Sequence, residues 1–186
     1  MVEITDRLAG ARNVLLTAPA MSDGADTCTS LLVEGVTEPN VLFVTYTRQP
    51  EACVAQLDQQ AVNEIGVITV TDTVSGGDEH LVGDVSTPGD LTGLGIQIGQ
   101  FLSERASSVV VCFDSLTSLL QYVDYETAYE FLHAVTGQVY AADARAHFHI
   151  DPVAHDEQHV AGIASLFDAR VEPDGEPTVR TRDLIN

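Results

Sequence analysis

Residues 108–114 read Ser-Val-Val-Val-Cys-Phe-Asp and form the most hydrophobic strand-like stretch of the chain. A short apolar run that ends in a polar residue is typical of a strand buried inside a parallel sheet. Similar runs occupy 13–18 (Asn-Val-Leu-Leu-Thr-Ala), 41–47 (Val-Leu-Phe-Val-Thr-Tyr-Thr), 65–71 and 144–150. The sequence therefore predicts five buried strands.

The segments between these strands favour helices. Apolar side chains recur at helical spacing in several of them, and Pro50 stands at a first-turn position that favours a helix start. Thr87-Pro-Gly-Asp90 predicts another start, with a cap residue, a proline and then an acid. The predicted helices cover 25–34, the segment from Pro50, the segment after Thr87 through Phe101, 124–142 and 156–167.

Two further segments complete the pattern. Residues 72–86 are polar and contain glycine, so we expect an exposed loop there. Residues 169–172 and 178–182 flank Pro173-Asp-Gly-Glu-Pro177, which predicts a closing β-hairpin. Strands that alternate with helices predict an α/β fold, with a mostly parallel sheet and helices on both faces. We expect one domain over 1–186, with any ligand beyond the carboxyl ends of the strands.

The charge of the chain is strongly negative. Among 186 residues, 28 are acidic and 8 are basic, for a formal net charge of −20. All basic residues are arginine, so Schiff-base, lysine-base and Walker A lysine chemistry are excluded. Dispersed acids without lysine indicate adaptation to a cytoplasm at molar salt, where the Debye length falls to about 3 Å. The absence of a basic patch argues against a nucleic-acid partner.

The remaining composition points to a cytoplasmic protein. No apolar run approaches the length of a membrane span, and the N-terminus lacks the pattern of a signal peptide. The three cysteines, Cys28, Cys53 and Cys112, lie in apolar stretches. We expect them to be buried free thiols in a reducing compartment.

The loop after the first strand is the first candidate site. A phosphate-binding loop there needs glycines, a lysine and a hydroxyl residue. Only Gly24 could serve as the second glycine, and the lysine and hydroxyl positions then fall on Ala25 and Asp26. The carboxylates of Asp23 and Asp26 would repel a phosphate, so the pattern favours an ordinary turn between strand and helix.

Asp114 is the second candidate. It ends an apolar strand, as the carboxylate that reaches the magnesium shell does in a Walker B strand. The simpler interpretation is that it bonds backbone amides or Ser115. A degenerate nucleotide site, if present, would use Ser22, Gly24 and Asp114.

The third candidate is the densest cluster, Ala146-His-Phe-His-Ile-Asp-Pro-Val-Ala-His-Asp-Glu-Gln-His159, which holds four of the six histidines. His147 and His149 alternate along a strand and so share one face. Together with Asp151 and His155 they are the metal-ligand candidates. No cysteine is near in sequence, so we favour a hydrogen-bonded network, with Asp151 or Asp156 capping the last helix and no stoichiometric metal.

Nucleophilic catalysis has little support in the sequence. Ser115 follows a strand but lacks the Gly-x-Ser-x-Gly elbow, because Phe113 and Asp114 precede it. The cysteines have no histidine beside them in sequence.

In this order of elements, the chain from about Asn13 to Val171 resembles the RecA/KaiC-like ATPase domain. Residues 13–19 look like the strand that enters the phosphate loop, and 41–51 look like the strand that ends in catalytic glutamates. Residues 109–120 resemble the Walker B segment, and 166–171 resemble the strand entering the terminal hairpins. More closely, Asp90-Leu-Thr-Gly-Leu-Gly, Phe113 to Tyr122 and His149-Ile-Asp-Pro-Val-Ala-His-Asp resemble a haloarchaeal family of this superfamily with no assigned function.

The chain departs from the pattern of active ATPases. The phosphate-loop lysine and hydroxyl are missing, and the catalytic-glutamate positions fall near Tyr46 and Thr47. Of the active set, only Asp114 survives. Phosphoryl transfer depends on those groups for electrostatic stabilisation. The resemblance therefore implies the fold and argues against its usual activity.

The expectation is a non-hydrolysing RecA/KaiC-like domain that acts as a cytoplasmic regulatory or protein-interaction module in a halophile. We expect a protein partner or a homo-oligomer, no membrane and no cofactor. One alternative is an enzyme or a metal or ligand sensor built on His147, His149, Asp151 and His155. Another is a nucleotide binder or weak ATPase that uses Asp114 with ATP and magnesium.

Overall fold

The computed structural model describes residues 4–8, 10–19, 22, 24–71, 79–105, 108–173 and 178–179. In this part of the chain, eight strands form one sheet in the order β4-β3-β2-β5-β6-β1-β7-β8. Every pair from β4 to β7 is parallel, and β8 runs antiparallel to β7. The strands are β1 (Asn13–Thr17), β2 (Asn40–Thr45), β3 (Glu64–Val70), β4 (Leu81–Val85), β5 (Val109–Asp114), β6 (Arg145–Ile150), β7 (Ala169–Val171) and β8 (Thr178–Val179). The expected α/β fold with a mostly parallel sheet is confirmed.

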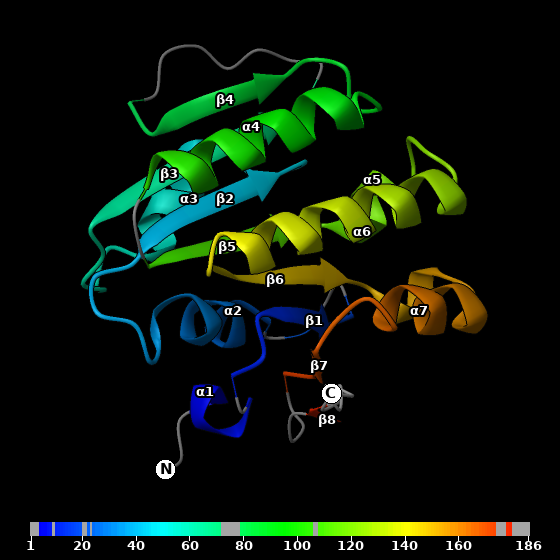
Figure 1. Ribbon diagram of the computed structural model, residues 1–186, viewed down its shortest axis with the longest axis horizontal. Coiled ribbons are helices and arrows are strands. Elements are labelled where there is room, and N and C mark those ends of the chain that lie inside the picture. Colours follow the sequence, from blue (N-terminus) through cyan, green and yellow to red (C-terminus); the bar gives the residue numbers. More distant parts are fainter. Residues whose placement is uncertain are drawn as a thin grey trace.

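Helices cover both faces of the sheet (Figure 1). They are α1 (Ile4–Arg7), α2 (Gly24–Val33), α3 (Pro50–Gln56), α4 (Leu91–Glu104), α5 (Leu116–Leu119), α6 (Tyr125–Ala141) and α7 (Glu157–Ala164), with a 3₁₀ turn at Pro152–Ala154. In the view of Figure 1, α4 and α6 lie in front of the sheet, while α2 and α3 lie behind it. This arrangement gives the sheet two separate cores.

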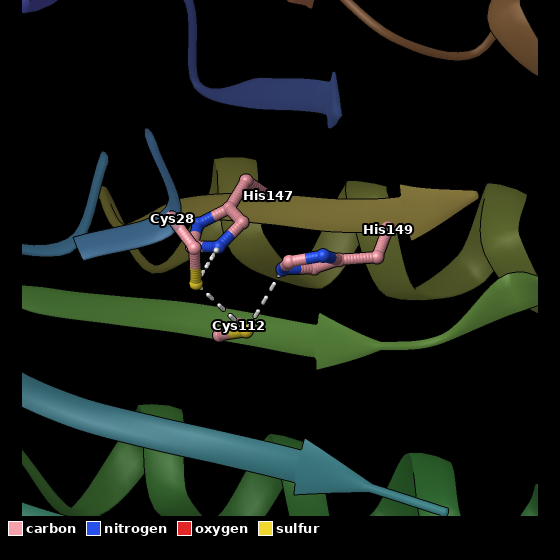
Figure 2. A group of neighbouring side chains, drawn as sticks. All are labelled: Cys28, Cys112, His147 and His149. Atoms are coloured by element: carbon pink, nitrogen blue, oxygen red, sulfur yellow. Dashed lines mark hydrogen bonds between the residues drawn. The ribbon is translucent and has the colours of Figure 1, made fainter. Parts of the chain in front are cut away.

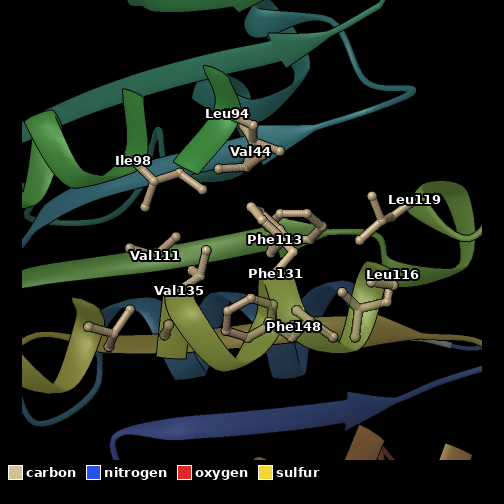
Figure 3. Close-up of a cluster of buried hydrophobic side chains, with 14 of the residues drawn as sticks. Val44, Leu94, Ile98, Val111, Phe113, Leu116, Leu119, Phe131, Val135 and Phe148 are labelled. Carbon is tan, nitrogen blue, oxygen red and sulfur yellow. The ribbon is translucent and has the colours of Figure 1, made fainter. Parts of the chain in front are cut away.

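The larger core lies beneath α4, α5, α6 and α7. Phe113 of β5 stands at its centre, with ring centroids 5.4 Å from Phe148 of β6 and 6.1 Å from Phe131 of α6. Figure 3 shows these rings beside Leu94 and Ile98 of α4. Alternate residues of β6 point to opposite faces, so Phe148 fills this core while His147 and His149 face the other one.

The second core lies beneath α2 and α3. It contains Leu16 of β1, Phe43 of β2 and Leu32 of α2. Three of its buried side chains are cysteines: Cys28, Cys53 and Cys112. All three are free and buried, as the sequence predicts.

Carboxylates begin several helices. Asp124 accepts a hydrogen bond from Thr127 N at the start of α6, and Asp156 accepts one from Gln158 N at the start of α7. Asp151 caps the 3₁₀ turn through Val153 N. Of the two residues expected to cap the last helix, Asp156 does so, whereas Asp151 caps the 3₁₀ turn before it. Side-chain acceptors at these positions satisfy amide donors that have no partner inside a helix.

The structure corrects two boundaries. Within the expected loop 72–86, residues 81–85 form β4, an edge strand; residues 72–78 lie outside the described residues. Only Val85 of this strand is buried, which explains its weak apolar pattern. The predicted helix start at Thr87 is also wrong, because α4 begins at Leu91 with Asp90 as its cap, 2.8 Å from Gly93 N.

The ends of the chain hold further details. The predicted hairpin is present as β7 and β8, with its turn residues 174–177 outside the described part. The sequence pattern did not predict the short helices α1 and α5. No helix among the described residues has both the length and the apolar character needed to cross a bilayer.

Candidate metal centre

Four sulfur and nitrogen ligand atoms meet beneath α2. His147 and His149 project from β6, Cys112 from β5 and Cys28 from α2 (Figure 2). The Cys28 Sγ lies 3.1 Å from His147 Nε2 and 3.7 Å from Cys112 Sγ, and Cys112 Sγ lies 3.4 Å from His149 Nε2. All four ligand atoms lie within 4.8 Å of one another.

The parallel sheet explains why these residues meet. In the β5–β6 register Cys112 stands directly opposite His147. His149 lies two residues along the same face of β6. Cys28 lies in the second turn of α2 on its buried side, with Leu31 and Leu32. The packing of α2 on the sheet therefore brings Cys28 to the other three ligands.

Three of the four residues of the cluster are buried. Cys28, Cys112 and His147 are each at most 1% exposed, and His149 is half-buried. The hydrogen bond from Cys112 and the neighbouring histidines hold the pKa of Cys28 well below its usual value, against the effect of burial. Burial raises the pKa of Cys112. Burial alone would lower the pKa of His149, but the hydrogen bond and the charge of Cys28 raise it above its usual value.

The spacing suits a tetrahedral ion. Zinc binds thiolate sulfur at about 2.3 Å and imidazole nitrogen at about 2.0–2.1 Å, so ligand atoms of a tetrahedral site lie about 3.3–3.8 Å apart. Three of the six separations, 3.1, 3.4 and 3.7 Å, approach those edges, and the other three are at most 4.8 Å. Two thiolates and two imidazoles are also a ligand set that structural zinc sites use.

Only half of the expected histidine and aspartate set is brought together. His155 Nε2 lies 3.0 Å from Thr117 Oγ1, and the same hydroxyl accepts a hydrogen bond from Asp151 N. Asp151 and His155 therefore belong to the contact between α5 and the chain after β6, and neither is one of the four residues whose ligand atoms meet. No cysteine lies near these histidines in sequence, but the fold brings Cys28 and Cys112 into contact with them.

The sequence contains one signal that bears on the two cysteines. The βαβ pattern predicts that the strand with Cys112 lies in the sheet and that the helix with Cys28 packs on it. Cys28 is 119 residues from His147, and Cys112 is 37 residues from His149. Strand order and register, which local patterns do not contain, bring them together.

The residues of the expected nucleotide site lie at the carboxyl ends of β1 and β5. Ser22 N and Ser22 Oγ donate to Pro19 O, and Gly24 N donates to Ser22 O. These two amides therefore point into the turn. Asp23 lies outside the described residues. The Asp114 carboxylate lies 4.0 Å from the Arg48 guanidinium.

Tyr46, one of the two positions where the resemblance would place a catalytic glutamate, has a structural role. Tyr46 is buried, and its ring lies 5.9 Å from Phe113 and 6.1 Å from Tyr122. Burial raises the pKa of Tyr46 far above its usual value, so the phenol stays neutral. Ser115 begins α5, where its side chain accepts a hydrogen bond from Ser118 N.

Comparison with known proteins gives a family. Residues 11–173 match a family of unknown function, DUF7504. The chain belongs to DUF7504. No curated protein matches the chain. Among solved structures, one from Pyrococcus horikoshii OT3, titled only as a structural study of a project target, has a TM-score of 0.63 at 13% identity. The match covers 92% of this chain and 87% of the other, and it shows the shared fold alone.

Proposed function

We propose that this DUF7504 chain is a metal-binding, non-hydrolysing domain of RecA/KaiC-like type. Cys28, Cys112, His147 and His149 would hold one zinc-type ion. The observation that carries the proposal is the meeting of these four ligand atoms within 4.8 Å of one another. A cytoplasmic regulatory role, through a protein partner or a second copy of the chain, is part of the same proposal.

The ligand count favours a structural or sensing ion over a catalytic one. Catalytic zinc keeps a position open for water, whereas a structural site is closed by four protein ligands. Here four ligands come from three elements, and three of them are almost completely buried. A bound ion would fix α2 against β5 and β6, so its loss would change the surface that α2 presents.

The proposal that the domain does not hydrolyse ATP rests on the residues that follow β1. Ala25 and Asp26 occupy the lysine and hydroxyl positions, and the Ser22 and Gly24 amides are hydrogen-bonded within the turn. A phosphate cradle needs such amides free to point at the ligand. These features support a fold used without phosphoryl transfer.

Zinc stoichiometry tests the proposal. We expect about one zinc per chain in untagged protein prepared without chelator, because the four ligands are already in place. Cys112→Ser should lose the ion, whereas Cys53→Ser, which removes a buried thiol outside the cluster, should keep it. Far-UV circular dichroism checks that both variants fold.

A cobalt titration keeps the test decisive if Cys112→Ser fails to fold. The metal-free parent should take up one cobalt ion with the sulfur-to-cobalt absorption of a thiolate site. A parent without stoichiometric zinc that also shows no such absorption would mean that the cluster is a hydrogen-bonded network. Equal zinc in parent and folded Cys112→Ser would place the ion elsewhere.

A further inference from the structure

A cavity lies beside α1, at the end of the sheet where the parallel strands begin. It has a volume of about 220 Å³ and opens between α1 and the starts of β1, β5 and β6. These are the amino ends of the strands, away from Asp114 and the turn before α2. The nucleotide-type site and this cavity are therefore separate places in the fold.

Three polar groups of the cavity lining lack hydrogen-bond partners. They are His147 Nδ1, Arg145 Nε and Thr5 Oγ1, all buried and unpaired within the described chain. His147 is 1% exposed. Figure 2 shows its second ring nitrogen on the side toward the start of β6, away from His149. Buried polar atoms are seldom left unpaired, so these groups point to an acceptor that the described residues do not supply.

The charge of the lining favours an anion. Arg12 and Arg145 are two of only eight basic residues in the chain, and both line the cavity. Arg12 is paired with Asp143, whereas Arg145 donates to the Glu34 backbone carbonyl. The Glu34 carboxylate accepts from Ile4 N. Burial and then the charge of Arg12 lower the pKa of Arg145, whereas the charge of Glu34 raises it.

The rest of the wall is apolar. Leu8, Val14, Leu31 and Val110 line the cavity beside the polar groups. An inorganic phosphate would leave this wall uncovered, and a nucleotide needs the larger volume of usual ligand pockets, about 300–1,000 Å³. An acid with a short hydrocarbon chain fits both parts of the lining.

We propose that this cavity binds a small organic carboxylate, whose head group accepts hydrogen bonds from Arg145 Nε, Thr5 Oγ1 and His147 Nδ1. The apolar chain then lies against Leu31 and Val110. Arg145 binds the carboxylate as a charged donor, a kind of hydrogen bond stronger than a neutral one.

His147 connects the cavity to the four-ligand cluster. A histidine that binds a metal through Nε2 carries its proton on Nδ1 and usually donates it to an acceptor. The carboxylate would be that acceptor, so zinc and carboxylate should strengthen each other's binding. This link rests on the proposed metal centre, whereas the cavity, Arg145 and Thr5 do not depend on it.

Calorimetric titration with potassium butyrate tests the proposal. Butyrate replaces potassium chloride at constant ionic strength, and zinc content is measured in each sample. We expect one butyrate per chain, with binding about tenfold weaker in Arg145→Gln, the effect of one lost charged hydrogen bond. Arg48→Gln removes the same charge at the opposite sheet edge and should leave butyrate binding unchanged.

Two further arms identify the ligand chemistry. Butanol, which lacks the carboxylate, and inorganic phosphate, which lacks the chain, should each bind more weakly than butyrate. Ala11→Leu should block binding by filling the cavity, which keeps the test valid if Arg145→Gln does not fold. No heat with butyrate, or equal binding in the parent and Ala11→Leu, would mean that the cavity holds only water. Because zinc content is measured separately, that result is distinct from failure of the metal centre.

Discussion

At the scale of single residues, Arg105 shows how one side chain joins distant parts of the fold. Its guanidinium donates through Nε and NH2 to both carboxylate oxygens of Glu64, at 2.7 and 2.6 Å. The same group lies 3.5 Å from the centroid of the Phe101 ring. The end of α4 is thereby held to the start of β3. Two parallel hydrogen bonds give this ion pair better geometry than an ordinary surface pair.

The Glu64–Arg105 pair predicts a pH dependence of stability. The hydrogen bond from Arg105 holds the pKa of Glu64 below its usual 4.5. The stabilisation is therefore present above that value and is lost as the pH falls through the lower, folded pKa. Since Glu64 is partly exposed, Glu64→Gln should lower the free energy of unfolding by about 0.5–1 kcal/mol at neutral pH.

Denaturant unfolding at several pH values measures this effect, in the lowest salt that keeps the protein folded. The difference between parent and variant should shrink as the pH falls below 4.5. Glu104→Gln is the matched control, because its carboxylate lies 3.5 Å from the same guanidinium but is 69% exposed. A Glu64→Gln effect that is equal at neutral and acid pH would exclude the ion pair as its cause.

The residues of the metal centre could be predicted only in part. Alternation along a strand places His147 and His149 on one face, and the structure agrees. Cys28 and Cys112 join them because β5 lies next to β6 and α2 crosses behind both strands. Those neighbour relations are properties of the whole sheet. His155 was placed wrongly because the 3₁₀ turn carries it to Thr117.

At the scale of elements, apolar runs located the strands well wherever a strand is covered on both faces. β1, β2 and β5 are almost continuously buried, so their sequences contain nearly unbroken apolar residues. The edge strand β4 has one buried residue and carries no such run. α5 escaped prediction because four residues are too few to show a helical period.

The turn that precedes α2 predicts the response to ATP. We expect ATP with magnesium to remain unhydrolysed above background, because the Ser22 and Gly24 amides are occupied and no lysine is present. Phosphate release measured with a sensitive coupled assay checks this. Turnover on the order of 0.01 per second that disappears in Asp114→Ala would show an active ATPase instead.

At the scale of the whole molecule, charge dominates. A net charge of −20 on 186 residues means that carboxylates repel one another over the folded surface. Salt screens that repulsion, with a Debye length of about 3 Å at 1 M and about 10 Å at 0.1 M. The fold itself follows from the apolar pattern, whereas the conditions under which it is stable follow from the charge.

The charge predicts a strong dependence of stability on salt. The melting temperature should be high in molar potassium chloride and fall as the salt concentration is lowered toward about 0.1 M. Scanning calorimetry across that range measures the trend, and zinc content must be constant across the samples. An unchanged melting temperature would contradict adaptation of this surface to high salt.

The central claim is that two cysteines and two histidines from three elements form one metal centre. X-ray absorption at the zinc edge of the untagged protein tests it most directly. We predict two sulfur neighbours at about 2.3 Å and two nitrogen neighbours at about 2.0–2.1 Å. A zinc shell of oxygen and nitrogen alone, or one with a different sulfur count, would contradict the assignment of Cys28, Cys112, His147 and His149.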